Sequence, residues 1–158
     1  MKYLPKSKWK KAGLILLFLF GLFQFYPRPE KNISSVEAKN SIEKLFPIPD
    51  SVLPILKTAC YDCHSNNTRY PWYSNIQPVA LFLNKHIVEG KKELNFDEFG
   101  TYTGRRQQSK LKAIASQVKN GDMPLSSYKA MHKEARLSDE ERNLVTNWFR
   151  NQLDSLNR

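Results

Sequence analysis

The sequence predicts an all-α protein, and two observations carry that prediction. Helix start and stop signals recur along the chain: Ser138 with Glu141 three residues later forms a capping box, and Gly121 ends another helical segment. Between such signals the apolar residues repeat at helical spacing, as in the stripe Leu111, Ile114, Ala115 and Val118. No convincing run of alternating polar and apolar residues indicates a strand.

Two helices are expected before residue 65. The first runs from 34 to about 45, with Ser34 as N-cap and Glu37 completing a capping box. The second is capped by Asp50, tolerates Pro54 in its first turn, and continues into a cysteine motif.

Three more helices are expected after that motif. One opens at Pro78 and closes at Gly90, and its apolar stripe places His86 on the inner face. Another covers about 106 to 119, and the last begins at Ser138 and continues toward Leu153.

The N-terminus carries an apolar run at 12–26, AGLILLFLFGLFQFY, broken only by Gln24. It follows a lysine-rich start, and no small-residue cleavage site follows it, so we interpret it as an uncleaved signal-anchor, with a cleaved signal as the alternative. The sequence thus predicts a cytoplasmic basic segment (1–11), a transmembrane signal-anchor (12–26), a linker (27–33) and one functional domain (34–158). The basic start should stay in the cytoplasm, which places the domain in the periplasm, tethered to the bacterial inner membrane.

The formal net charge of +10 is concentrated at the start, because five lysines lie in the first eleven residues. The rest of the chain has 20 basic and 15 acidic side chains, a balance of +5. That balance suits an acidic protein partner or an anionic membrane surface. It does not indicate nucleic-acid binding, because no basic stripe with interleaved aromatic residues is found.

The two cysteines of the chain lie in one motif, Cys60-Tyr61-Asp62-Cys63-His64. This CxxCH spacing is the attachment signature of c-type haem. Two thiols three residues apart reach the two vinyl groups of one porphyrin edge, and the histidine that follows ligates the iron as the proximal base. The motif therefore predicts one covalently bound haem c, which also fits export to an oxidising compartment.

Two other interpretations of the cysteines remain open. A thiol redox pair would need a βαβ context, whereas this neighbourhood is predicted to be helical. A zinc-stabilised interaction module would combine Cys60 and Cys63 with His86 or His132, but the chain has no second CxxC.

The expected sixth iron ligand is Met123, in the segment Gly-Asp-Met-Pro-Leu between two predicted helices. Pro124 stiffens the loop at this point, and Met–His ligation is the arrangement of cytochromes c. The alternative distal ligand is His86, and the alternative role of Met123 is packing in the core.

The chain resembles the bacterial haem-binding-domain family, a c-type cytochrome-like group. The segments that carry the resemblance are CYDCHSNNTRYPWYSNIQPVA, HIVEGKKELNF, GDMPLSSYKAMH and LSDEERNLVTNWF, within about residues 50–149. The resemblance implies a small, cytochrome c-like helical domain, with haem on Cys60 and Cys63, His64 as proximal ligand and Met123 as the expected distal ligand. Electron transfer is implied only by analogy with other mono-haem cytochromes.

Several further residues are candidates for the haem surroundings. Arg69, Arg105 and Arg106 are candidates to pair with the propionates, or else are solvated surface charges. Trp72 is a candidate for the pocket wall. The carbonyl of Pro78 is expected to orient the ring of His64.

The leading hypothesis is therefore a membrane-tethered electron carrier with an acidic redox partner and no catalytic residues. The alternative is a haem enzyme or a gas or redox sensor, peroxidase-like, with an open distal position where His86 serves as the acid–base group.

Overall fold

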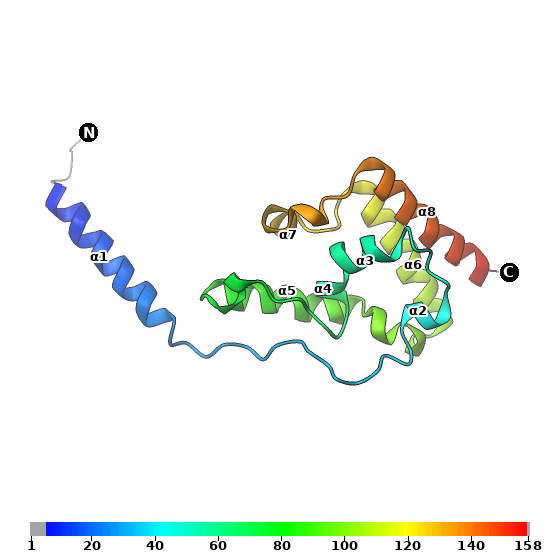
Figure 1. The fold of residues 1–158 in the computed structure, drawn as a ribbon, viewed down its shortest axis with the longest axis horizontal. Helices are drawn as coiled ribbons and strands as arrows, with labels where there is room; N and C mark the ends of the chain where they lie inside the picture. The colour runs from blue at the N-terminus through cyan, green and yellow to red at the C-terminus, as the bar shows by residue number, and fades with distance from the viewer. Residues whose placement is uncertain (1–5, 158) are drawn as a thin grey trace. The chain divides into compact units, whose positions relative to one another are not determined.

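The computed structural model describes residues 6–157, and all regular structure within them is helical, as predicted (Figure 1). Residues 1–5, which begin the predicted cytoplasmic segment, and residue 158 lie outside the described residues. The chain forms two compact units. One contains the residues up to Lys31 together with Tyr70–His86, and the other contains Asn32–Arg69 and the residues from Ile87 onward.

In the first unit, Gln24, which interrupts the apolar run at 12–26, has a structural role. This unit contains α1 (Lys6–Phe23), the 3₁₀ helix η1 (Trp72–Asn75) and the first turns of α5 (Val79–Glu93). The Oε1 atom of Gln24 accepts a hydrogen bond from the backbone N–H of Gln77 (3.0 Å), and its Nε2 donates to the Gln77 carbonyl (3.0 Å). Gln24 therefore pairs with a fully buried residue of the same unit.

Helix α1 presents its apolar side chains to the surroundings: Leu14, Leu17 and Phe18 are 65–69% exposed. It starts and ends before the boundaries predicted for the signal-anchor, which were 12 and 26. Among residues 6–157, no helix combines the length and the apolar character that crossing a bilayer requires. The predicted transmembrane segment is therefore unconfirmed.

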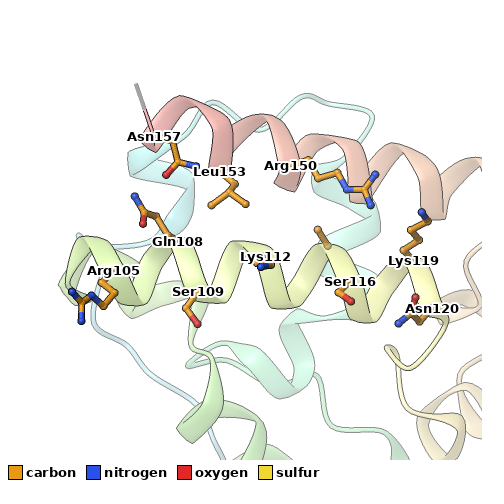
Figure 2. A pocket seen from close by; sticks show the side chains of 11 residues that line it. Arg105, Gln108, Ser109, Lys112, Ser116, Lys119, Asn120, Arg150, Leu153 and Asn157 are labelled. Atoms are coloured by element: carbon orange, nitrogen blue, oxygen red, sulfur yellow. The ribbon is translucent and has the colours of Figure 1, made fainter.

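The second unit is a bundle of short and long helices. In chain order they are α2 (Ile42–Leu45), α3 (Leu53–Ala59), α4 (Tyr61–His64), the end of α5, η2 (Phe96–Thr101), α6 (Gly104–Asn120), α7 (Ser126–Met131), η3 (Lys133–Ala135) and α8 (Asp139–Leu156). The two longest, α6 and α8, pack side by side in opposite directions (Figure 2). Their pairing is fixed at one end by Gln108 Nε2 to the Leu156 carbonyl (3.5 Å), and at the other by Arg142 Nη1 to the Val118 carbonyl (3.1 Å).

The core of this unit lies between α6, α8 and the shorter helices. Seven of its members come from five elements of the chain and are at most 1% exposed: Ile42, Leu56, Phe96, Phe99, Leu111, Val145 and Phe149. Each of these side chains contributes roughly 1.5–3 kcal/mol by leaving water. The short helices α2, α3 and η2 are therefore held firmly against α6 and α8.

The signals that predicted the end of α6 and the start of α8 are confirmed. Ser138 and Glu141 form the predicted capping box, with Ser138 Oγ accepting from the Glu141 N–H (3.1 Å) and Glu141 Oε2 accepting from the Ser138 N–H (2.8 Å). Gly121 ends α6 with φ at 80°, a left-handed conformation that favours glycine.

Two helix boundaries were predicted wrongly before the cysteine motif. Of the helix expected over 34–45, only Ile42–Leu45 is helical. Ser34 does not cap a helix, because its hydroxyl accepts from the N–H of Val36 (3.1 Å) in a local turn. Asp50 does not cap the next helix either, since α3 starts at Leu53 after Val52.

A third boundary, at Gly90, was also predicted wrongly. Helix α5 continues through Gly90 to Glu93, and the glycine serves a close packing contact of the helix instead of ending it.

Replacing Ser138 by alanine removes the hydrogen bond to the Glu141 N–H, and we expect the free energy of unfolding to fall by about 1 kcal/mol. Thermal or denaturant unfolding of the full chain measures this change. Ser109→Ala is the matched control: this exposed residue in the middle of α6 has no cap to lose, and alanine is the better helix former. An equal decrease in the free energy of unfolding in both variants would contradict the capping role of Ser138.

Candidate functional site

The cysteine motif forms one tight helical turn. The N–H groups of Cys63 and His64 both donate to the Cys60 carbonyl, at 3.2 and 3.0 Å. Residues three apart on a helix share one face, so the two thiols lie on the same side of this turn with His64 directly after them. Both cysteines are free and partly buried. The predicted residues Cys60, Cys63 and His64 are thus brought together.

The surroundings of the thiols keep them protonated at neutral pH. Burial raises the pKa of Cys60 to about 12, with the charge of Cys63 adding to the effect. Burial also raises the pKa of Cys63, to about 11, and the Asp62 carboxylate contributes. Reactive redox thiols have the opposite property, a lowered pKa. These cysteines therefore lack the electrostatics of a thiol redox pair.

The ring of His64 is held by two backbone carbonyls. Its Nδ1 lies 3.0 Å from the oxygen of Gly90 and 3.0 Å from the oxygen of Leu94. A carbonyl only accepts hydrogen bonds, so Nδ1 carries the proton and Nε2 keeps its lone pair. Burial lowers the pKa of His64, which favours the neutral ring. A neutral imidazole with a free Nε2 is the form that ligates a metal.

The predicted role of Pro78 in orienting this ring was wrong. The Pro78 carbonyl instead accepts from the N–H of Phe82 (3.1 Å), which is the first hydrogen bond of α5. The carbonyls that reach His64 come from the other end of α5 and the residue that follows it: the Gly90 oxygen also accepts from the Leu94 N–H (2.9 Å), and Leu94 comes directly after the helix.

Gly90 allows α5 to lie against the motif. A Cβ atom at this position would be 2.7 Å from the carbonyl oxygen of Cys63 and 3.3 Å from its Cβ. The close approach of two backbones thus explains why glycine occupies a position within α5, where it is otherwise unfavourable by roughly 0.5–1 kcal/mol.

Asp62 lies between the two cysteines, and its buried carboxylate accepts hydrogen bonds from three groups. The Arg69 guanidinium donates from Nε to Oδ1 (3.2 Å) and from Nη2 to Oδ2 (3.3 Å), and the Arg69 backbone N–H donates to Oδ1 (3.0 Å). The hydroxyl of Tyr128, on α7, donates to Oδ2 (2.6 Å). Arg69, predicted as a partner of a propionate, is paired here with Asp62, which raises the pKa of the guanidinium.

The predicted distal ligand, Met123, lies in the connection between α6 and α7. Its side chain is partly buried, and its backbone N–H donates to the Gln117 carbonyl (3.2 Å). Five residues later, Tyr128 is bonded to Asp62 of the motif. The connection that carries Met123 is thus tied to the motif through α7, and ligation by Met123 stays a prediction.

His86 and Trp72 belong to the first unit, whereas the cysteine motif belongs to the second. The Nδ1 atom of His86 lies 2.9 Å from the carbonyl of Phe82, one turn earlier on α5, and its ring packs 4.3 Å from the Phe82 ring. Trp72, the candidate for a pocket wall, is 77% exposed. The predicted roles of both residues remain untested.

The remaining candidates have other neighbours. The Arg106 guanidinium stacks over the Tyr102 ring at 3.9 Å, and Arg105 is exposed on α6. The ring of His132 stacks on that of Tyr128 at 4.2 Å. Across the part of the chain that the structure describes, no three His, Cys, Asp or Glu side chains are grouped to hold a metal ion. The zinc alternative therefore gains no support.

The residues that position the motif were not predicted from the sequence. Asp62 and Tyr128 are 66 residues apart, and no periodic pattern links them. The signal for Gly90 was present as a glycine within a helical pattern, which is as consistent with close backbone contact as with a helix end.

Comparison with known families decides the assignment of the chain. It matches the model of the haem-binding domain family over residues 18–151. The chain belongs to this family. Comparisons with curated proteins and with solved structures gave no significant match. The free Nε2 of His64 beside two thiols on one helical face fits the group that the family binds.

Replacing Gly90 by alanine should push α5 away from the motif, because the new Cβ would collide with the Cys63 carbonyl. We expect a loss of about 1–3 kcal/mol in the free energy of unfolding and a lower haem content. Gly104→Ala is the control, since nothing lies within 4 Å of a Cβ at that position. The packing role would be refuted if the two variants unfolded alike and retained the same amount of haem.

Proposed function

We propose that this haem-binding protein is a c-type cytochrome-like electron carrier. One haem is attached through thioethers to Cys60 and Cys63, and His64 is its proximal ligand. When bound, the haem supplies an iron centre that accepts and releases one electron. The residues of the chain attach this group, orient its proximal ligand and limit the access of water to it.

The hydrogen bonding of the His64 ring is the observation that carries the proposal. Its Nδ1 is committed to the carbonyls of Gly90 and Leu94, which leaves only Nε2 for a metal. Hydrogen bonds of this kind fix the tautomer of ligating histidines and raise their basicity. The two thiols on the preceding turn have the spacing that covalent attachment needs, and their raised pKa values argue against a separate redox role.

Met123 is proposed as the distal ligand. Two features support this assignment: the residue lies in a connection between two helices, and Tyr128 links the following helix to the motif. A thioether ligand raises the reduction potential and leaves no open position for a substrate. Electron transfer to a protein partner is therefore favoured over peroxidase-like or gas-sensing chemistry.

We also propose that the N-terminal apolar segment attaches the protein to the bacterial inner membrane, with the haem-binding part in the periplasm. The support is the exposed apolar surface of α1 together with the lysines at its start. Basic residues at the beginning of such a segment stay on the cytoplasmic side. Covalent haem attachment outside the cytoplasm agrees with this arrangement.

Covalent attachment is tested on the full chain purified from a host that matures c-type cytochromes. We expect haem staining after denaturing electrophoresis and an intact mass equal to the chain plus one haem. The double variant Cys60→Ser, Cys63→Ser should lose both signals, because no thioether can form. Met123→Ala is the control and should keep them. Unstained wild-type protein of apoprotein mass would overturn the proposal.

The distal ligand is tested by optical spectra of Met123→Ala beside His86→Ala. We expect the sulfur-to-iron charge-transfer band to disappear only in Met123→Ala, which should also bind carbon monoxide rapidly in the ferrous state. Loss of low-spin character only in His86→Ala would instead assign His86 as the ligand. Rapid carbon monoxide binding by the wild type would favour the sensor or enzyme alternative.

Membrane attachment is tested by replacing residues 1–23 with a cleavable export signal, which leaves Gln24 in place. We expect the unmodified chain to resist extraction by alkaline carbonate and the shortened chain to appear in the soluble periplasmic fraction. A full chain that carbonate extracts completely would contradict the attachment.

A further inference from the structure

The surface of α6 carries cations at a regular spacing that the haem chemistry does not explain. Arg105, Lys112 and Lys119 follow one another at intervals of seven residues (Figure 2). Seven residues make almost two helical turns, so the three cations lie on one face, about 10 Å apart along the axis. On the neighbouring helix α8, Arg150 adds a fourth cation beside the same face.

These cations border a groove between α6 and α8 with a volume of about 710 Å³. The residues that line it include no carboxylate and no aromatic ring, and the partly exposed Leu153 supplies apolar surface. Within residues 6–157, none of the four cations forms an ion pair. Their charges are therefore available to a molecule from outside.

We propose that this groove binds an acidic α-helical segment of a partner protein. Carboxylates that repeat every seven residues on such a helix have the same spacing as Arg105, Lys112 and Lys119. An apolar residue between them would contact Leu153. This is recognition of an amphipathic helix in a groove, with charge complementarity fixing the register.

The geometry makes other anions poorer fits. A single phosphate is too small to reach cations about 10 Å apart. Single-stranded nucleic acid is usually held by aromatic side chains that stack on the bases, and the lining has none. An anionic membrane presents a broad, flat surface, which cannot enter the groove that these cations border.

The test uses the full chain in neutral detergent and a fluorescent helical peptide of about 21 residues, with glutamate at every seventh position and leucine between. We expect fluorescence anisotropy to show binding that weakens as salt is added, because exposed charges are screened. A peptide with glutamine in place of each glutamate should bind at least about tenfold more weakly.

Charge reversal assigns the binding to the groove. We expect the double variant Lys112→Glu, Arg150→Glu to lower the affinity at least about tenfold. The control Lys39→Glu, Lys133→Glu changes the net charge equally at exposed positions outside the groove, and should bind within about twofold of wild type. Circular dichroism verifies that both variants are folded.

Equal weakening in the two double variants would overturn the proposal, because it would indicate attraction to net charge alone. So would tighter, groove-dependent binding of an oligothymidine or of phosphatidylglycerol vesicles. The groove shares no residue with the haem-binding motif, so failure here leaves the proposed function unaffected.

Discussion

The two hydrogen bonds from His64 to the carbonyls of Gly90 and Leu94 are the constraint around which the site is organised. They fix which ring nitrogen is free, and they require the end of α5 to lie directly against the turn of the motif. That approach in turn requires a residue without a side chain at Gly90, where a Cβ would be 2.7 Å from the Cys63 carbonyl. The proposed proximal ligand is thus oriented by the fold alone, which would lower the cost of ordering it when a metal binds.

A second constraint comes from the buried carboxylate of Asp62. An ionised carboxylate away from water is unfavourable unless charged or hydrogen-bonding groups surround it. Arg69 and Tyr128 supply them, and each does so from a different part of the chain. Removing either partner would leave the carboxylate incompletely satisfied, at a cost of roughly 1–3 kcal/mol. The interaction therefore links α7 to the motif and limits how far the connection containing Met123 can move.

The sequence allowed prediction of features that depend on neighbouring residues. The capping box at Ser138 and the helix end at Gly121 are formed by local hydrogen bonds and backbone conformation, and both are confirmed. The Cys60–His64 motif was recognisable because its spacing is the one that covalent haem attachment requires. The partners of Asp62 and His64 were not predictable, because they depend on which distant segments meet after folding. Gly90 was misassigned because a glycine marks a helix end and a close backbone contact equally well.

Backbone carbonyls orient His64, and the basic groove is separate from it, so the iron chemistry and the recognition of a partner would reside on different surfaces. We infer that the fold alone sets the tautomer of His64. The most direct measurement is nitrogen-15 NMR of the histidine rings in the haem-free full chain at neutral pH. We predict a neutral His64 ring with the proton on Nδ1. A proton on Nε2, or a mixture of tautomers in fast exchange, would contradict the claim.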